Sequence, residues 1–267
     1  MLDILKNRWK QGHRTLSYPR EVPKLAERFR GRPLVDPAKC PEGCSACVEA
    51  CPTAAIQASP LKVDLGACLF CPACSEACPT GAIGFGTDHR LAVSRREDLL
   101  FEGGQAKLAA ALDARLRRIF GRSLKLRQVS AGGCNACEAD LNVLGINVFD
   151  LGRFGIQFVA SPRHADGVVI TGPVSANMRH ALLETLEATP KPRVVIAVGA
   201  CAISGGPYAG SPEVVGIPPE IPVDLFIPGC APHPLTLLDG FLRLLGRLEE
   251  AKAATPEAQT ANAATTG

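Results

Sequence analysis

The sequence has few aromatic residues, no large excess of charge of one sign and no long apolar segment. Aromatic residues make up 5% of the 267 residues, too few for the stacked platforms that bind single-stranded nucleic acid. The net charge of +3 is also too balanced for a chain whose main partner is nucleic acid. No window has the uninterrupted apolar length of a membrane-spanning helix, and residues 1–10 lack the features of a signal peptide. We therefore expect a cytoplasmic chain with no span of its own and no nucleic-acid partner.

Cysteine is the residue that stands out, with twelve copies. A chain in a reducing cytosol uses clustered cysteines for metals or redox chemistry rather than for disulfide bonds. Hydrophobic residues make up 46% of the sequence, so an apolar core does not depend on disulfides. The cysteines therefore predict metal or redox centres.

Eight cysteines lie near the N-terminus, and six of them belong to an internal repeat of 27 residues. The repeated motif is Cys-x2-Cys-x3-Cys-Pro-Thr, and its cysteines are Cys44, Cys47 and Cys51, then Cys71, Cys74 and Cys78. Each half is typical of a short strand, a Cys-rich loop, a helical turn and a second strand. Because each half is too small to bury a core alone, we expect residues 36–93 to form one small α+β domain.

The second copy, preceded by Cys68, has the spacing of bacterial ferredoxins. There, three close thiolates bind one 4Fe–4S cluster and the fourth binds the other cluster of the pair. We therefore assign Cys40, Cys44, Cys47 and Cys78 to cluster 1, and Cys68, Cys71, Cys74 and Cys51 to cluster 2. The first copy departs from the pattern because Cys40 lies four residues before Cys44, where three is usual, so a three-iron cluster is an alternative there. A pair of zinc sites is another, although structural zinc prefers ligand pairs separated by a longer loop.

Residues 122–250 alternate apolar strands with helices, which predicts a parallel sheet covered on both faces. We expect strands at 124–130, 156–160, 167–171, 193–198 and 223–227, and helices at 139–144, 177–188 and 235–248. Residues 94–121 are expected to be a helical connector, with a helix from about Gln105 to Phe120.

The two ends of the chain differ from the rest. Residues 1–35 are basic and rich in proline, which predicts an extended arm. Its first ten residues are amphipathic, with Leu2, Leu5 and Trp9 on one side. The arm is either solvated or lies on a partner subunit or near a membrane surface. Residues 251–267 have no periodicity and are predicted to be a disordered tail.

The remaining four cysteines follow predicted strands. Cys134 and Cys137 stand at a strand-to-helix junction, and Cys201 and Cys230 follow two later strands. The carboxyl ends of parallel strands meet at one sheet edge, so we expect these thiols to bind one further 4Fe–4S cluster. A thioredoxin-like pair at Cys134 and Cys137 is an alternative. A nucleotide site in the glycine-rich loop around Cys201 is another, although the Gly-x-Gly-x-x-Gly spacing is absent.

Several segments resemble a known family. They are Gly133-Cys134-Asn135-Ala136-Cys137, Phe158 to Asp166, Thr171 to Val174, Gly199-Ala200-Cys201-Ala202 and Pro228-Gly229-Cys230-Ala231-Pro232. They resemble the small subunit of energy-converting, formate-hydrogenlyase-type (group 4) membrane-bound nickel–iron hydrogenases. The homologous 20 kDa subunit of complex I has its first two cysteines adjacent, so the gap between Cys134 and Cys137 favours the hydrogenase side. Through Ser17-Tyr18-Pro19 and Phe29 to Pro33, the N-terminal part resembles a separate ferredoxin-like subunit of the same complexes.

The resemblance implies a fusion of two electron-transfer subunits. It implies a flavodoxin-like, doubly wound α/β domain at 122–250, with the proximal 4Fe–4S cluster on Cys134, Cys137, Cys201 and Cys230. A chain with three 4Fe–4S clusters and no catalytic residue of its own would relay electrons. The implied partners are a hydrogenase-type large subunit, an electron donor such as a formate dehydrogenase, and integral membrane subunits, at the inner face of the cell membrane. A complex I-like quinone oxidoreductase without nickel and a free-standing electron carrier are the alternatives.

Four further residues have two interpretations each. The family usually has a glutamate three positions after the second cysteine; here Asp140 takes that position, and Glu138 is also acidic. The two acids either contribute to a proton path or stay solvated at a helix start, where negative charge is favourable. His164 and His233 are either structural or tune a cluster. Neither is required as a ligand, because twelve cysteines fill three four-thiolate sites.

Overall fold

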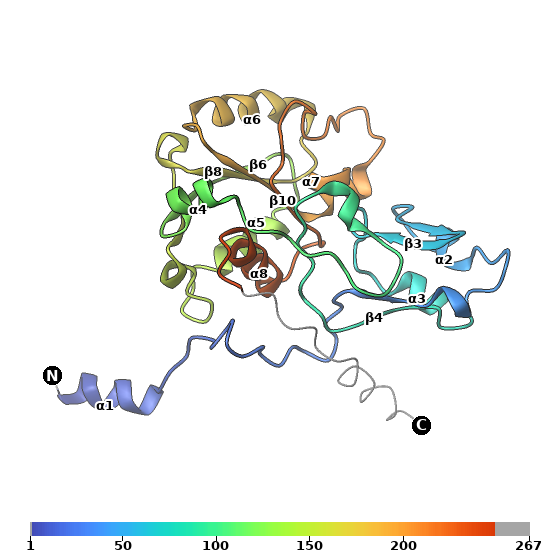
Figure 1. The fold of residues 1–267 in the computed structure, drawn as a ribbon, viewed down its shortest axis with the longest axis horizontal. Helices are drawn as coiled ribbons and strands as arrows, with labels where there is room; N and C mark the ends of the chain where they lie inside the picture. The colour runs from blue at the N-terminus through green and yellow to red at the C-terminus, as the bar shows by residue number, and fades with distance from the viewer. Residues whose placement is uncertain (1, 249–267) are drawn as a thin grey trace.

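A parallel five-stranded sheet forms the centre of the molecule (Figure 1). The computed structural model describes residues 2–248, and the tail predicted at 251–267 lies outside them. The strands are β1 Pro33–Val35, β2 Ile56–Ala58, β3 Leu61–Asp64, β4 Ile83–Phe85, β5 Leu100–Phe101, β6 Leu124–Ser130, β7 Ile156–Phe158, β8 Gly167–Thr171, β9 Val194–Val198 and β10 Leu225–Ile227. The α-helices are α1 Leu2–Gln11, α2 Ala46–Glu49, α3 Ala73–Ala77, α4 Ala114–Phe120, α5 Ala136–Val143, α6 Ala176–Ala188, α7 Gly199–Ser204 and α8 Pro234–Leu244.

The order of strands in the central sheet is β10-β9-β8-β6-β7, and every neighbouring pair is parallel. Numbered along the chain within this sheet, that order is 2-1-3-4-5, as in flavodoxin-like folds. Each of the five strands predicted for residues 122–250 is present. The predicted parallel sheet is therefore confirmed, and the chain has a mixed α/β structure consistent with a flavodoxin-like fold.

Helices cover both faces of the central sheet. On one face, Leu182 and Leu186 of α6 share a core with β8 and β9. On the other face, α5 and α8 pack against the alternate residues of the same strands. Figure 1 shows α6 on the opposite side of the sheet from α5 and α8. Because both faces are covered, β8 and β9 are buried along their whole length, which explains why they are continuous apolar runs.

The N-terminal part forms two small antiparallel sheets. One has the order β2-β3-β5, and the other pairs β1 with β4. In each half of the repeat, a short helix (α2 or α3) is followed by a strand (β2 or β4), as predicted. Six cysteines lie inside or against the apolar core that these elements form, namely Cys40, Cys47, Cys51, Cys68, Cys74 and Cys78. The cysteine-rich loops are therefore held by this core.

The two parts of the chain pack directly on each other. Val93 forms an antiparallel bridge with Phe226 of β10. Ile203 and Phe226 pack against the N-terminal core, whereas Ala92 belongs to the core under the central sheet. At Gly66 the approach is so close that a Cβ atom would lie 2.7 Å from Cγ2 of Ile203. The N-terminal part is thus built onto the central sheet.

A buried polar network also joins the two parts, and we call it the Tyr18–Asp239 network. The hydroxyl of Tyr18 donates to Oδ1 of Asp239 at 2.8 Å, and Nε of Arg243 donates to Oδ2 at 2.7 Å. His89 lies edge-on to Tyr18, with Nε2 at 3.4 Å from its hydroxyl. Burial lowers the pKa of His89 and raises that of Tyr18. The network therefore ties the N-terminal arm and the segment around His89 to α8.

The connector differs from its prediction, because its helix begins at Ala114 rather than near Gln105. The preceding residues run without helical structure along other elements. The amide of Ala109 donates to the carbonyl of Ala92 at 2.7 Å, and that of Leu112 to the carbonyl of Leu244 at 2.9 Å. Both side chains are buried in the core under the sheet. The helix-like spacing was misleading because tertiary contacts satisfy this segment instead.

Among the described residues, no helix combines the length and the apolarity needed to cross a bilayer. The arm also differs in part from its prediction, because residues 2–11 form helix α1 rather than extended chain.

Candidate metal centres

In each of the three predicted groups of four cysteines, the charges of three thiols raise the pKa of the fourth. Set 1 is Cys40, Cys44, Cys47 and Cys78; set 2 is Cys51, Cys68, Cys71 and Cys74; set 3 is Cys134, Cys137, Cys201 and Cys230. All twelve thiols are free. Among residues 2–248, no three His, Cys, Asp or Glu side chains are grouped so as to hold one metal ion.

Set 1 lies around helix α2, which contains Cys47, and around Cys78, which directly follows helix α3. Burial raises the pKa of Cys47, and the charges of Cys40, Cys78 and Cys44 raise it further. The longer spacing between Cys40 and Cys44 is absorbed by a turn, in which Gly43 has a positive φ of 76°. Cys40 is therefore placed with the other three thiols despite the irregular spacing.

Cys78 shows how the backbone stabilises a thiolate in set 1. Burial alone would raise its pKa, but hydrogen bonds from the backbone of Thr80, Ile83 and Ala82 lower it to about 7. The amide of Ala82 lies 3.2 Å from Sγ. The proline after Cys78 carries no amide hydrogen, so these donors come from further along the chain. This thiol is already prepared for the deprotonated form that binds metals.

Set 2 lines an enclosed, mainly apolar cavity. Its walls include the four thiols together with Pro33, Pro52, Ala55, Ile56, Val63, Leu69, Ile83 and Phe85. Burial raises the pKa of Cys68 to about 12, and the charges of Cys74, Cys51 and Cys71 add to this effect. Backbone amides of Phe70 and Ala55 lie 3.3 Å from the sulfurs of Cys68 and Cys51. The surroundings exclude water but still offer hydrogen bonds to sulfur.

Set 3 lies at the carboxyl ends of three strands of the central sheet. Cys134 lies in the turn between β6 and α5, and Cys137 lies in the first turn of α5. Cys201 lies in α7 after β9, and Cys230 follows β10. The pKa of Cys137 is raised to about 12. Burial is the main cause, and the charges of Glu138, Cys201, Cys230 and Cys134 raise it as well. Cys134 and Cys230 are exposed at the surface. The convergence that the strand ends predicted is therefore present in the fold.

Glycines leave the space that set 3 occupies. A Cβ atom at Gly199 would lie 2.6 Å from Sγ of Cys137, and one at Gly206 would lie 3.0 Å from Sγ of Cys201. Both glycines also have positive φ angles, which other residues rarely adopt. The glycine-rich loop that suggested a nucleotide site thus serves to bring the backbone close to two thiols.

Glu138 is buried rather than solvated, so one of the two interpretations is wrong for this residue. It is 4% exposed, and its Oε1 accepts hydrogen bonds of 2.6 Å from Ser130 and from Thr171. These two hydroxyl residues end β6 and β8, and the sequence interpretation missed them. In the sequence, hydroxyl residues at the ends of two neighbouring strands could have indicated that a buried polar side chain lies between them.

Asp140 and the two histidines are placed differently. Asp140 is half-buried, and burial raises its pKa. His164 is exposed in the turn Pro162–His164. His233 caps α8, with Nδ1 accepting from the amide of Leu235 at 3.1 Å, and its ring lies edge-on to Phe29 at 5.1 Å. The structural interpretation therefore accounts for His233.

Sets 2 and 3 are neighbours. A cavity between them is lined by Leu69 and Phe70, which precede Cys71, and by Cys230. The charge of Cys71 contributes to the raised pKa of Cys230, after burial and the charge of Cys134. Sets 1 and 2 are also in electrostatic contact, because the charge of Cys47 affects Cys74. Set 2 therefore adjoins both set 1 and set 3, and we call the three sets, in the order 1, 2, 3, the row.

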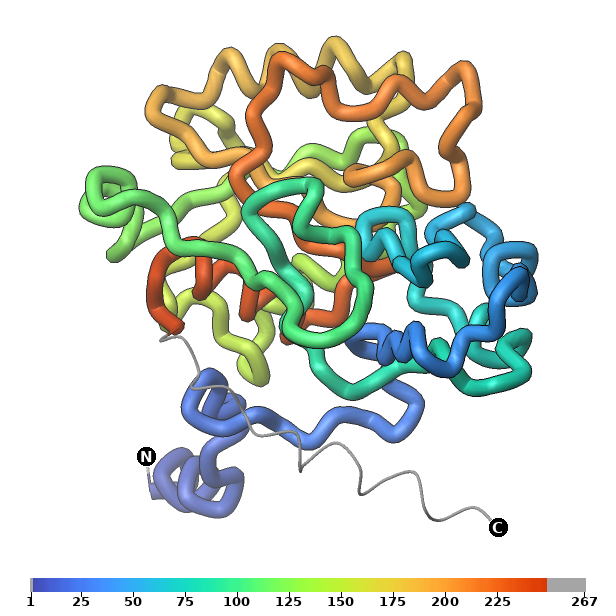
Figure 2. Tube along the Cα trace, turned by 45° about the vertical axis from the view of Figure 1, so that its right-hand side comes forward, coloured from blue at the N-terminus to red at the C-terminus, as the bar shows by residue number. Residues whose placement is uncertain are grey.

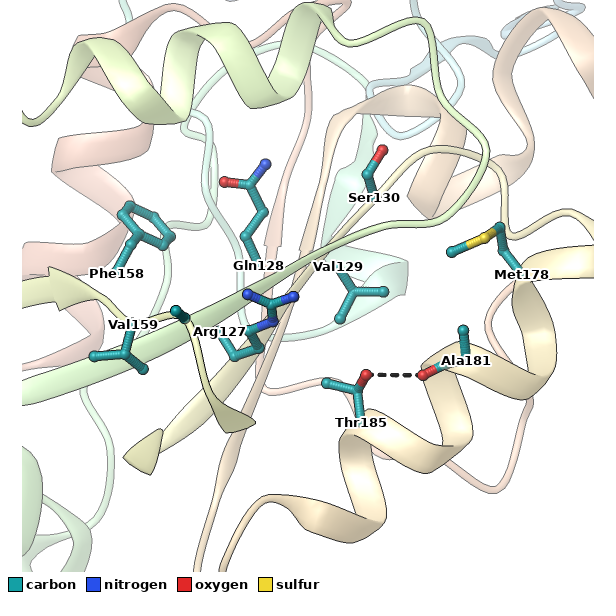
Figure 3. A pocket seen from close by; sticks show the side chains of 10 residues that line it. Arg127, Gln128, Val129, Ser130, Phe158, Val159, Met178, Ala181 and Thr185 are labelled. Carbon is teal, nitrogen blue, oxygen red and sulfur yellow. Dashed lines mark hydrogen bonds between the residues drawn. The ribbon is translucent and has the colours of Figure 1, made fainter. Parts of the chain in front are cut away.

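A large open cavity of about 610 Å³ lies away from this row, and no cysteine lines it. It lies between the end of β6, the end of β7 and the residues after it, and helix α6. Figure 3 shows Arg127 between Val159, which follows β7, and Thr185 of α6. Nε of Arg127 is buried without a hydrogen-bond partner among the described residues. The structure does not connect this cavity with the thiols.

Comparison with known proteins assigns the second half of the chain to a family. Residues 134–244 match the family described as NADH ubiquinone oxidoreductase, 20 Kd subunit. This region begins at Cys134 and contains all of set 3.

Individual relatives belong to two kinds of complex. Formate hydrogenlyase subunit 7 of Escherichia coli is 42% identical over 53% of this chain, and the match spans 56% of that subunit's length. An NADH-quinone oxidoreductase subunit of Heliobacterium modesticaldum is 41% identical over 45% of this chain and 69% of its own length. A probable membrane-bound hydrogenase subunit of Pyrococcus furiosus is 39% identical over 51% of this chain and 81% of its own length. These relatives are subunits of oxidoreductase complexes, and the chain belongs to the family of the NADH ubiquinone oxidoreductase 20 kDa subunit.

Proposed function

We propose that this chain is an iron–sulfur electron-relay subunit of a membrane-associated complex whose large subunit is of the nickel–iron hydrogenase type. The observation that carries the proposal is the row of three four-cysteine sets, in which set 3 lies in the part that matches the family. In this proposal residues 36–93 are a ferredoxin-like domain with two 4Fe–4S clusters. Residues 122–250 hold the proximal 4Fe–4S cluster, and no residue of the chain is catalytic.

The cysteine sets suit such clusters, because each supplies the four thiolates that a 4Fe–4S cluster takes. When bound, a cluster of this type accepts and donates single electrons. The chain's own residues bind it through sulfur, exclude water with the apolar walls around set 2 and donate backbone hydrogen bonds to sulfur. Gly199 and Gly206 keep space free at set 3. Hydrogen bonds and burial of this kind tune the reduction potential.

The exposure of two cysteines supports a position for the large subunit in this proposal. Cys134 and Cys230 of set 3 are exposed, and a partner surface over them would exclude water from this end of the row. We assign that surface to the large subunit, and the set 1 end to an electron donor such as a formate dehydrogenase. Integral membrane subunits complete the complex, which we place at the inner face of the cell membrane.

A complex I-like oxidoreductase without nickel is the second candidate. The observation in its favour is that relatives from hydrogenase-type and NADH-quinone oxidoreductase complexes are 42% and 41% identical to this chain. Sequence identity therefore does not distinguish a hydrogenase-type complex from a complex I-like one. The gap of two residues between Cys134 and Cys137 favours the hydrogenase side.

The metal content of the native complex tests this proposal. We expect a complex captured anaerobically through a tag on this chain to hold about one nickel, with roughly twelve iron on this chain from three four-iron clusters. An untagged strain processed in parallel gives the background. Full iron without nickel would favour the second candidate. A chain that purifies alone as a stable, monodisperse species would contradict both and favour a free-standing carrier.

The charge of Glu138 is expected to lower the reduction potential of the centre bound by set 3. Its carboxylate raises the pKa of Cys137, where it is the largest cause after burial. It also raises the pKa of Cys201, where burial and the charges of Cys230 and Cys134 have larger effects. A Glu138→Gln variant keeps hydrogen-bonding capacity but removes the charge, so the midpoint potential should rise by some tens of millivolts. A redox titration followed by electron paramagnetic resonance measures this. The exposed Glu184 supplies the matched control, Glu184→Gln. An unchanged midpoint in Glu138→Gln would show that this charge has no influence.

A further inference from the structure

Helix α1 projects from the body of the molecule and is exposed along its whole length (Figure 2). Its large apolar side chains are among the most exposed in the described residues. Trp9 is 90% exposed, Leu2 and Ile4 are each 73% exposed, and Leu5 is 63% exposed. A tryptophan in full contact with water is unfavourable, so this helix has a surface that a further contact would cover.

The side chains of α1 are arranged as in helices that lie at a membrane surface. Leu2, Leu5 and Trp9 are spaced by three and four residues and share one side. Lys6, Lys10 and Arg8 flank this side, and their long side chains can reach the headgroups while the apolar groups insert. Tryptophan is favoured at the level of the headgroups because its ring is amphipathic. The sequence of α1 therefore suits the boundary between headgroups and acyl chains.

The positive charge of the whole chain is concentrated at this end. The chain has 29 Lys and Arg against 26 Asp and Glu. Residues 1–14 alone contain four of the former and one of the latter, so the remaining residues balance at 25 of each. A neutral body with a basic, amphipathic end is attracted to an anionic lipid surface in one orientation.

The fold fixes where α1 leaves the body. Five residues after α1 ends, the amide of Leu16 donates to the carbonyl of Val148 at 2.9 Å. Arg153 donates to the carbonyls of Leu16 and Tyr18 at 2.8 and 2.9 Å. Ile146 and Val148, in the same loop, are 49% and 36% exposed. The chain is thus anchored beside a second exposed apolar site five residues after the helix ends.

We propose that α1 binds the surface of a bilayer rich in anionic lipid, with Leu2, Leu5 and Trp9 inserted and with Ile146 and Val148 facing the same surface. The basic residues contact the lipid headgroups. This contact would hold the chain at the membrane without a spanning helix. It is independent of the proposed electron transfer, because it uses no cysteine.

Trp9 is the only tryptophan in the chain, so its fluorescence reports on α1 alone. The anaerobically purified full chain with its iron is mixed with vesicles of equal parts phosphatidylcholine and phosphatidylglycerol. We expect a shift of the emission to shorter wavelength, quenching by brominated acyl chains, and sedimentation of the chain with the vesicles. Vesicles of phosphatidylcholine alone should bind much more weakly.

Two variants separate the apolar and the electrostatic contributions. The triple variant Lys6→Gln, Arg8→Gln and Lys10→Gln should bind about a hundredfold more weakly, since each basic residue near an anionic surface contributes about a factor of five. Leu5→Glu should lose at least tenfold, because it puts a charge into the inserted face. The matched control is Ile119→Glu, at a 49% exposed position of α4, which should bind as the unmodified chain does.

Three results would overturn this proposal. They are unchanged Trp9 emission with anionic vesicles, equal binding to phosphatidylcholine alone, and full binding by the triple variant. Loss of a protein subunit from the captured complex in Leu5→Glu, without any change in vesicle binding, would assign α1 to a protein partner instead. Vesicle binding by a chain that proves to carry no iron would leave the lipid contact intact and contradict only the relay.

Discussion

Replacing Cys137 with alanine should reduce the iron of the purified chain from roughly twelve to roughly eight atoms, because one four-iron cluster would be lost. Cys137 is the member of set 3 whose pKa responds to all three of its partners. Gly199 leaves the space beside its sulfur free of a side chain. We also expect electron transfer to the large subunit to stop, since set 3 is the end of the row assigned to that partner.

Iron analysis and electron paramagnetic resonance of the anaerobic chain measure this loss. Ala139→Ser, at an exposed position of α5, is the matched control and should keep all the iron. Retention of full iron in Cys137→Ala would contradict the assignment of set 3. Loss of all the iron would mean that the three sets do not bind independently.

Replacing Asp239 with alanine is expected to give the largest loss of stability in the Tyr18–Asp239 network. Asp239 is completely buried and accepts hydrogen bonds from Tyr18 and Arg243. Its removal leaves a largely buried guanidinium and a buried hydroxyl without their acceptor. Breaking a buried ion pair in this way costs about 3–5 kcal/mol of the free energy of unfolding.

Denaturant unfolding of the anaerobic chain, followed by circular dichroism, measures that cost. Tyr18→Phe removes a single hydroxyl and keeps the ion pair of Asp239 and Arg243, so it should cost only about 1 kcal/mol. Equal losses in the two variants would contradict a dominant role of the ion pair. A loss below about 1 kcal/mol in Asp239→Ala would show that water replaces the missing carboxylate.

The elements that the sequence predicted well are those in which local pattern and tertiary environment agree. Residues 167–171 and 194–198 are continuous apolar runs, and they form strands buried on both faces. The cysteines after the strands converge because the carboxyl ends of parallel strands share one edge. Spacing also groups Cys47 and Cys68 with the thiols whose charges raise their pKa values.

The features that the sequence did not predict depend on contacts between distant segments. Residues 105–113 have a helix-like pattern, yet Ala109 and Leu112 pair with the backbone around Ala92 and Leu244. Glu138 was compatible with a solvated helix start, and only the approach of Thr171 from the neighbouring strand shows that it is buried. The contact of sets 2 and 3 depends on how the N-terminal part sits on the central sheet. No local pattern in the sequence encodes that arrangement.

The shared packing of the two parts has a consequence for how the row of cysteines persists under dilution. Val93 joins β10, and Ile203 and Phe226 enter the N-terminal core. Two separate polypeptides would lose translational and rotational freedom when they associate, at a cost of several kcal/mol, and would come apart at low concentration. In one chain that loss is avoided, and the two parts are always made in equal numbers. The contact between sets 2 and 3 therefore has no dissociation constant, and it is the same at every concentration of the protein in the cell.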